Sequence, residues 1–448
     1  GDFVRFRYGL PEKIGGWEEI IDKKVVGAIR EQLIWADLDG RKYVALGSNK
    51  VLVIYFEGAY YDITPLDTPI TGATFTTVNT SATVTVNKIG HGLTEGDLFT
   101  FTSVTPPTGA GYVASDFETN TFQVVTATVD TFTITMASAA GTSVAASGSA
   151  TINPYVEVGP LNQTAGYGWG TSSWGGQSGL VTTLNGALAD DTQGNNGSAT
   201  EITVTSALGF PTSGSIKVGT EFISYTNITG NILEGITRGS GGTRTAHSNG
   251  ASVEYFTAWG QASTSTTVLL DPASWSLDHF GSTLVATIKN GKTFKWEAIS
   301  SNPPALTTRA TAITGAPTTS VMSIVSERDR HLIILGTETT IGTESTQDKM
   351  FIRFSDQENL SDYTPTSTNT AGTFRLDSGV KIVGAAKAKD YILILTDTSA
   401  YIMQFVGPPF TFSIRQVGSN CGLIGQHAIK YVNGKVFWMG QAGGFFCL

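Results

Sequence analysis

The chain has 448 residues, of which 40% are hydrophobic and only 15% are charged. A chain with this apolar content is not expected to be disordered. Its length allows two to four domains, or one large β core with insertions. The net charge is −9, which argues against a protein that grips nucleic acid through phosphate contacts.

The N-terminal region, about 1–70, is predicted to consist of strands. Trp17 to Arg30 is rich in Val and Ile and is predicted to be a strand rather than a helix. Asp37-Leu38-Asp39-Gly40 resembles the start of a calcium loop, but the other ligands are missing, so a turn is predicted. The run from Lys42 to Phe56, with a short polar break, then reads as a β-hairpin.

The composition changes after this hairpin. Residues 71–156 are rich in Thr, Val and Ala, alternate cleanly in places such as Thr83 to Val86, and predict a small β module. Residues 157–197 are rich in Gly, Ser, Asn and Gln and are predicted to be a long connection. Residues 198–256 alternate again and predict a second small β module.

A weak internal repeat links the first hairpin to the C-terminal half. Each copy is an apolar run, a turn with Gly or Asp, and a second run rich in aromatic residues. The copies cover 42–56, 283–296, 330–354, 391–405 and 435–446. From the second copy onward they recur at roughly 40–60 residues, the spacing of propeller blades. The Asn290-Gly291 pair is a favoured two-residue hairpin turn.

These patterns predict an all-β protein, a β-propeller with two small inserted β-sandwich or barrel-like modules. The propeller is expected to comprise 1–70 and the blades of 257–448, with both modules inside one connection, where insertions cost little. The first residue is Gly1 and the last, Leu448, follows a strand-like run, so we expect both ends of a longer protein to be missing.

Few residues or motifs of the sequence predict catalysis or metal binding. The five histidines lack metal-ligand spacing and are each predicted to be turn or surface residues: His91, His247, His279, His331 and His427. The two cysteines, Cys421 and Cys447, are predicted to be buried apolar residues. No catalytic residue, cofactor or metal is predicted, and no apolar run is long enough to span a bilayer.

Three aromatic side chains stand out in the Gly-rich connection: Tyr167, Trp169 and Trp174. Packing onto the propeller or a neighbouring subunit is the favoured interpretation, and stacking on sugars is the alternative. They are therefore the candidate subunit-contact or partner-contact residues.

Several stretches resemble one family, the tail nozzle of short-tailed bacteriophages, also called tail tubular protein B. The resemblance covers about 1–70 and 275–448 and is carried by Arg5–Trp17, Gly47, Asp62–Pro65, Ile352–Asn359, Asp362–Pro365, Thr368–Gly372, Thr396–Thr398, Gly407–Phe410 and Gly418–Ile424. The segments Gly90–Asp97 and Gly209–Gly239 are similar instead to β modules that decorate phage structural proteins.

The resemblance implies a non-enzymatic virion protein of the tail. It implies a sixfold ring below the adaptor and portal that extends the DNA channel, helps to retain the genome until ejection, and anchors fibres or spikes. DNA would pass without sequence-specific binding, because an acidic conduit has few cations to trap phosphates. Two other classes stay open: a glycan-binding tail adhesin, and a glycan-degrading propeller enzyme, which needs two suitably spaced carboxylates.

Overall fold

The computed structural model describes residues 4–13, 24–161, 164–165, 177–241, 243–256, 269–298, 306–441 and 443–448. These residues are almost entirely strands and turns, with one short helix, α1 (Ala114–Glu118), and one 3-10 turn, η1 (Glu344–Thr346). The chain divides into two compact units. One comprises Gly1–Pro65 with Ala273–Leu448, and the other is Leu66–Pro272. Among the described residues no helix has the length and apolar character to cross a lipid bilayer.

Besides a short two-stranded pair near the N-terminus, the described residues of the first unit form five larger antiparallel sheets, which we call blades 1 to 5 in chain order. Blade 1 comprises β3 (Ile29–Ala36), β4 (Lys42–Ser48), β5 (Leu52–Phe56) and β6 (Ala59–Asp62), and blade 2 comprises β24 (Trp275–Phe280), β25 (Thr283–Ile288), β26 (Thr293–Trp296) and β27 (Thr311–Ala312). Blade 3 comprises β28 (Met322–Ser326), β29 (His331–Leu335), β30 (Phe351–Phe354) and β31 (Gly372–Arg375). Blade 4 comprises β32 (Ile382–Lys387), β33 (Ile392–Thr396), β34 (Ser399–Gly407) and β35 (Thr411–Ser419), and blade 5 comprises β36 (Ile429–Val432), β37 (Lys435–Met439) and β38 (Phe445–Cys447).

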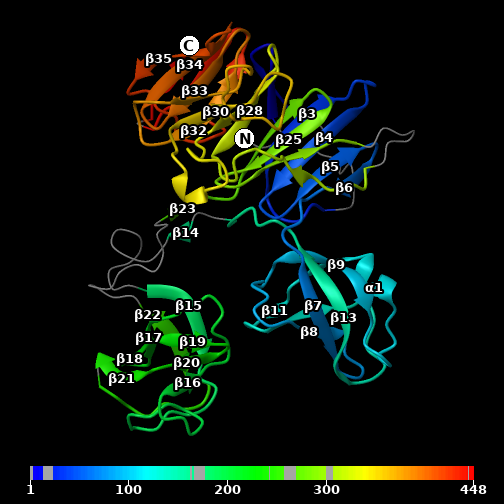
Figure 1. Ribbon diagram of the computed structural model, residues 1–448, viewed down its shortest axis with the longest axis vertical. Coiled ribbons are helices and arrows are strands. Elements are labelled where there is room, and N and C mark those ends of the chain that lie inside the picture. The colour runs from blue at the N-terminus through cyan, green and yellow to red at the C-terminus, as the bar shows by residue number, and fades with distance from the viewer. Residues whose placement is uncertain are drawn as a thin grey trace. The chain divides into compact units, whose positions relative to one another are not determined.

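Successive blades pack through their first strands. The strand β24 contacts β3 and β28, β28 contacts β32, and β32 contacts β36. Figure 1 shows the blades following one another from blue through green and yellow to red. This arrangement of small antiparallel sheets around an axis is a β-propeller. The all-β propeller predicted from the repeat is therefore the observed fold.

The predicted hairpin copies correspond to the second and third strands of the blades. In blades 1 to 4 these are the middle strands and are largely buried, and β29 and β33 are buried at every position, whereas β38 is the exposed edge strand of blade 5. A strand covered on both faces is apolar throughout, which is why its sequence signal is the strongest. The Asn290-Gly291 turn joins β25 to β26 as predicted, with Asn290 at φ 58°.

Blades 1 and 2 meet where a tryptophan lies against a glycine. The Trp275 side chain is fully buried, and its indole Nε1 donates to the Ser48 carbonyl oxygen at 2.8 Å. A Cβ atom at Gly47 would lie 2.6 Å from Trp275 Cδ1, closer than two carbon atoms can approach. The absence of a side chain at Gly47 is therefore what lets the indole reach the backbone of blade 1.

We predict that Gly47→Ala lowers the free energy of unfolding of the propeller by about 1–3 kcal/mol, because the added methyl group overpacks the Trp275 site. Gly425→Ala is the matched control, since a Cβ there meets nothing within 4 Å. Urea denaturation of both variants measures the difference. An unchanged unfolding midpoint for Gly47→Ala would contradict this account of the contact.

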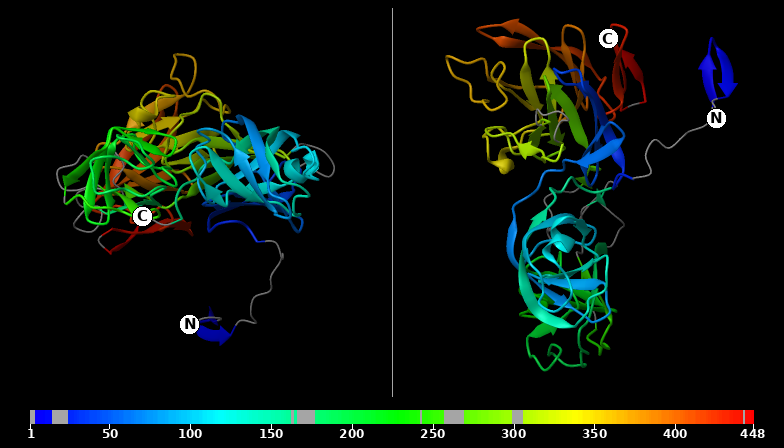
Figure 2. Two further views of the ribbon diagram at one scale, coloured as in Figure 1. Left: turned by 90° about the horizontal axis from the view of Figure 1, so that it is seen from below. Right: turned by 90° about the vertical axis from the view of Figure 1, so that its right-hand side faces the viewer.

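The first inserted module is one curled sheet. Its strands are β7 (Ile70–Thr77), β8 (Thr83–Asn87), β9 (Leu98–Thr105), β10 (Thr121–Gln123), β11 (Thr126–Ala127), β12 (Thr131–Thr135) and β13 (Val144–Pro154). They are ordered β10-β9-β13-β7-β8-β12-β11. The long strand β13 pairs with both β7 and β9 through register shifts, which bend it. Figure 2 shows this curvature in its right-hand view. The sheet encloses an aromatic core that includes Phe75, Phe99 and Phe101.

The second module has a five-stranded and a three-stranded sheet. The larger contains β15 (Gln177–Thr183), β22 (Ser252–Phe256), β17 (Gly214–Val218), β18 (Glu221–Tyr225) and β21 (Thr237–Gly241), in that order. The smaller contains β16 (Glu201–Thr203), β20 (Ile232–Glu234) and β19 (Asn227–Thr229). Two further short pairs lie elsewhere in the chain: β1 (Val4–Arg7) with β2 (Leu10–Lys13), and β14 (Thr164–Ala165) with β23 (Leu269–Leu270).

Three sequence-based assignments differ from the structure. The second module begins at β15, within the predicted connection 157–197, because β15 pairs with β22 and Leu184 and Leu188 join the module's core. In the predicted strand Trp17–Arg30, residues 24–28 are not strand and β3 begins at Ile29, while 17–23 lie outside the described residues. Cys421 is buried as expected, but Cys447 is exposed because it lies on β38, at the edge of blade 5.

A buried ion pair organises the second module. Both side chains of Glu221 and Arg238 are fully buried, and the guanidinium donates to both carboxylate oxygens at 2.9 and 2.8 Å. Arg238 also donates to the carbonyl oxygens of Ala189 and Thr245, and His247 Nε2 lies 2.9 Å from Glu221. Burial raises the pKa of Glu221, but the hydrogen bonds from Arg238 and Thr245 outweigh it, so the pKa is lowered. This cluster ties two connections to β18.

We predict that Arg238→Met lowers the free energy of unfolding of this module by about 3–5 kcal/mol, because it leaves the Glu221 carboxylate buried without its cation. The control is Arg244→Met, whose partner Asp190 is exposed, with an expected change of about 0–1 kcal/mol. Hydrogen exchange of the full chain reports both. Because the pKa of Glu221 is lowered on folding, the stabilisation is present at neutral pH and is lost on acidification. Equal losses in the two variants would contradict the prediction.

Candidate functional site

The propeller has an open axial cavity of about 630 Å³. It is lined by the first strands of all five blades, from Glu31 on β3 to Lys430 on β36. Because the first strand of each blade faces the axis, residues far apart in the sequence converge here. Ionisable groups from different blades lie on this wall: Glu31, Asp278, His279, Glu327, Lys387 and Lys430.

Lys387 contacts two carboxylates of this wall. Its ammonium nitrogen lies 2.6 Å from Asp278 Oδ1 and 2.7 Å from Glu327 Oε1. The second oxygen of Asp278 accepts the backbone N–H of Val325 at 2.7 Å. The pKa of Glu327 is lowered, chiefly by its hydrogen bond from Lys387. One lysine on blade 4 thus joins blade 2 to the end of β28 in blade 3.

Among the described residues, one group has side chains suited to a metal ion. Ligand atoms of Asp278, His279 and Glu327 lie within 4.8 Å of one another. The ammonium group of Lys387 already lies between the two carboxylates, and a divalent cation would have to displace it. The donor set therefore fits an internal salt bridge better than a metal centre.

The first and fifth blades meet at a carboxyl–imidazole pair. Glu31 Oε2 lies 3.4 Å from His427 Nδ1. Burial raises the pKa of Glu31 to about 7, against a weaker lowering by Lys430. Burial, together with the charge of Lys289, lowers the pKa of His427. Both shifts favour the neutral forms, so this contact is weaker than an ion pair between two full charges.

We predict that the propeller loses stability as the pH rises through about 7, because the pKa of Glu31 is raised on folding and the folded state therefore binds its proton more tightly. The Glu31→Gln variant should remove roughly 1–3 kcal/mol of this pH dependence. Chemical denaturation across the pH range measures it. Glu344→Gln, an exposed position in the same unit, is the control. A Glu31→Gln profile parallel to the wild type would refute the assignment.

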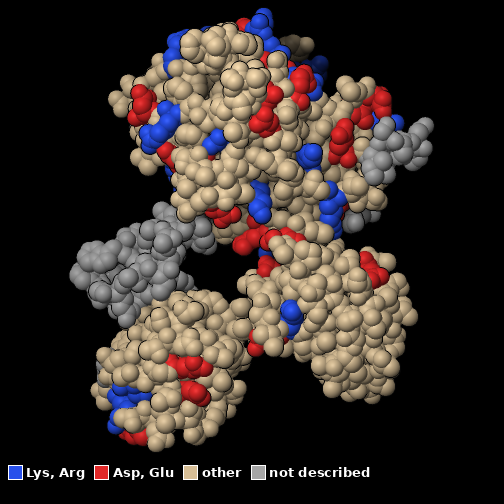
Figure 3. Space-filling view, viewed as in Figure 1, with Lys and Arg blue, Asp and Glu red and all other residues tan. Residues whose placement is uncertain are grey.

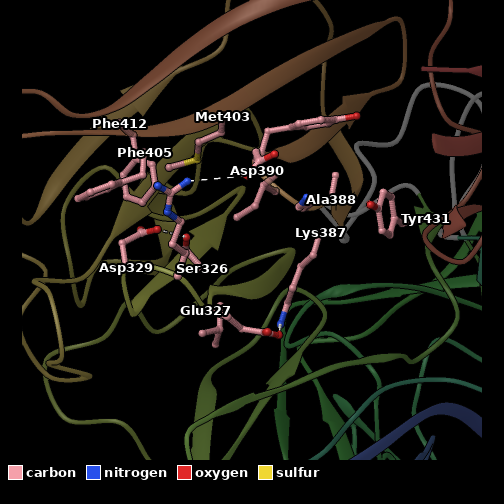
Figure 4. A pocket seen from close by; sticks show the side chains of 15 residues that line it. Ser326, Glu327, Asp329, Lys387, Ala388, Asp390, Met403, Phe405, Phe412 and Tyr431 are labelled. Carbon is pink, nitrogen blue, oxygen red and sulfur yellow. Dashed lines mark hydrogen bonds and ion pairs between the residues drawn. The ribbon is translucent and has the colours of Figure 1, made fainter. Parts of the chain in front are cut away.

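A second hollow of about 510 Å³ lies beside the axial cavity, between blades 3 and 4. Its floor is apolar and includes Met403, Phe405 and Phe412, whereas charged residues of the β28–β29 and β32–β33 turns form its rim. Figure 4 shows Lys387 reaching towards Glu327, and Asp329 lying apart from them beside Ser326. Four of the rim charges form pairs: Arg328 with Asp390 at 3.8 Å, and Lys387 with Glu327. The apolar floor of this hollow could hold an apolar group.

The aromatic residues and the histidines singled out in the sequence have different outcomes in the structure. Tyr167, Trp169 and Trp174 lie outside the described residues, so their contact role stays a prediction. The prediction that every histidine is a turn or surface residue is wrong for His91 and His331, which are 4% and 0% exposed. His91 Nδ1 accepts the Leu93 N–H at 3.0 Å and its ring packs on Phe132, while its Nε2 atom is buried without a hydrogen-bond partner.

The sequence contained no signal for the axial wall. Glu31, Asp278 and Lys387 are separated by more than a hundred residues from one another, and each is an isolated charge on a first strand.

The Asp37–Gly40 segment, in contrast, is the predicted turn between β3 and β4, and Arg41 Nη1 lies 3.1 Å from Asp39. Figure 3 shows that charged residues are frequent on the visible propeller face and sparse on the first module.

Comparisons with known proteins give no family. No family model matches the chain, and no curated protein matches it. Among solved structures, apo AztD from Citrobacter koseri is 9% identical, with 84% of this chain and 71% of that chain covered and a TM-score of 0.23. The phage phi92 endosialidase is 12% identical, with 98% of this chain and 65% of that chain covered and a TM-score of 0.19. Likenesses at this level do not bear on function.

Proposed function

We propose that this chain is a structural subunit of a bacteriophage tail nozzle. In this role it forms a ring, expected to be a hexamer, that extends the DNA channel below the adaptor and portal. It helps to retain the genome until ejection, and it anchors fibres or spikes. The protein acts by assembly rather than by catalysis, and its place is the virion tail.

The main support for the proposal is that the bounds of the resemblance agree with the bounds of the two compact units. The stretches that resemble nozzle proteins cover about 1–70 and 275–448, and the propeller unit comprises Gly1–Pro65 and Ala273–Leu448. The stretches that resemble decorating modules fall in the other unit, Leu66–Pro272. Two kinds of sequence resemblance thus coincide with two compact bodies, which supports the view that a nozzle-like core has accepted an insertion in one connection.

The residues that carry the resemblance have structural contacts. Gly47 admits Trp275, and Asp62 accepts hydrogen bonds from Thr64 and pairs with Arg309. The Trp438 indole donates to the Cys421 carbonyl oxygen at 2.7 Å. These motifs hold connections and blade contacts in place and do not line a pocket with free reactive groups. They therefore support an assembly role.

The inner wall of the propeller supports the same conclusion. Asp278 and Glu327 share one lysine, and Glu31 contacts His427. Glycoside hydrolysis needs one carboxylate free to act as acid and another free to act as base or nucleophile. Asp278 and Glu327, which both pair with Lys387, therefore favour a scaffold over a hydrolase.

The test is electron microscopy of intact virions with an antibody against this chain, together with light scattering of the purified protein. We expect a sixfold ring in the axial tube and subunit interfaces above roughly 2,000 Å². A chain found only at fibre tips, with glycan binding lost in the double variant Trp169→Ala and Trp174→Ala, would replace the nozzle with an adhesin. Turnover of host polysaccharide abolished by one Asp or Glu substitution would replace it with an enzyme.

A further inference from the structure

A buried histidine in blade 3 lies in a chain of hydrogen bonds. His331, the first residue of β29, is fully buried. Its Nδ1 atom lies 3.1 Å from Asp329 Oδ2, and its Nε2 atom lies 3.0 Å from Thr370 Oγ1. Both ring nitrogens are therefore engaged on opposite sides of the imidazole, with no room for solvent.

The chain continues beyond Thr370 to a second carboxylate. The Thr370 hydroxyl lies 2.7 Å from Asp356 Oδ1 and accepts the backbone N–H of Gln357 at 2.9 Å. Asp356 Oδ1 also accepts the Thr370 N–H at 2.8 Å. Although burial alone would raise the pKa of Asp356, these hydrogen bonds lower it, so Asp356 is ionised.

With both carboxylates ionised, counting protons favours one state of the imidazole. Three contacts need a proton: Asp329 with His331, His331 with Thr370, and Thr370 with Asp356. A neutral imidazole supplies one proton and the threonine hydroxyl supplies one, which leaves one contact without a proton. An imidazolium supplies two and satisfies all three contacts. A buried polar contact without its proton is costly, so the count favours the charged ring.

The surroundings supply compensating charge on two sides only. The carboxylates of Asp329 and Asp356 flank the ring, and its other neighbours are the aromatic rings of Phe354, Phe405 and Phe412, at 6.3, 5.8 and 5.2 Å between centroids. The adjacent cation, Arg330, is directed elsewhere, over Phe280 and against Glu358. Among the described contacts of His331, none is to a cation.

The same network holds parts of two blades together. Thr370 and Asp356 belong to the connection between β30 and β31, and the Thr370 carbonyl oxygen accepts the Thr411 hydroxyl from blade 4 at 3.1 Å. Phe405 and Phe412, from the β34–β35 hairpin, cover the imidazole and also form the floor of the hollow between blades 3 and 4.

We propose that His331 is a buried imidazolium and that its proton is a conformational lock, which holds the β30–β31 connection and the β34–β35 hairpin against blade 3. Loss of the proton leaves one contact of the Asp329–His331–Thr370–Asp356 chain without a hydrogen. The connection of residues 355–371 then loosens, and with it the floor of the hollow. The inference is independent of the proposed nozzle role.

The first test is NMR of the full chain with ¹⁵N-labelled histidine, in which the His331 signals are those missing from His331→Gln. At about pH 7.5 we expect both ring nitrogens of His331 to be protonated. In Thr370→Val, which removes the hydroxyl, we expect a neutral ring with its proton on Nδ1, while Thr370→Ser keeps the charged ring. A neutral ring in the wild type, or the same signals in Thr370→Val as in Thr370→Ser, would overturn the proposal.

The second test needs no substitution. Hydrogen exchange of the wild type, corrected for the intrinsic pH dependence, is compared between about pH 7 and about pH 9.5. We expect protection of residues 355–371 to fall by about tenfold or more, while the β24–β25 hairpin, which lies outside the network, keeps its protection. Equal changes in the two segments would show that the proton is not the lock.

Discussion

The propeller depends on one constraint: its most buried middle strands, β29 and β33, are apolar on both faces. A strand such as β33, buried at every position, cannot sit in a sheet that shows either face to water. The five blades satisfy this by stacking face against face around an axis. The close approach of Trp275 to the backbone at Gly47 is one local expression of the constraint, because it removes the space that would separate blades 1 and 2.

Stacking brings the first strands together, and that has an electrostatic consequence. Ionisable groups that are isolated along the sequence come together on one axial wall. Lys387 contacts Asp278 and Glu327, and Glu31 contacts His427, across different blades. Away from this wall, the Asp329–His331–Thr370–Asp356 chain joins the β30–β31 connection to β29. The interior charges therefore serve mainly to fix blade against blade.

The two modules of the inserted unit are stabilised by contacts of their own. Each module has its own core, rich in aromatic residues in the first and mainly aliphatic in the second, which also holds the buried Glu221–Arg238 pair. Both lie in the single connection between β6 and β24, so the propeller strands pair without them. A fold with this property can accept decorations without loss of its core, which suits the assembly role that we propose.

The sequence alone determined the all-β class, the repeated hairpins and the two modules, because strand alternation and turn residues are local signals. It could not show that the hairpins were the middle strands of blades, or that the second module begins at β15. Nor did it place His331 in the interior or bring Glu31 to His427, which lie 396 positions apart. Those features depend on which side chains meet when the blades stack, and only the tertiary structure decided that.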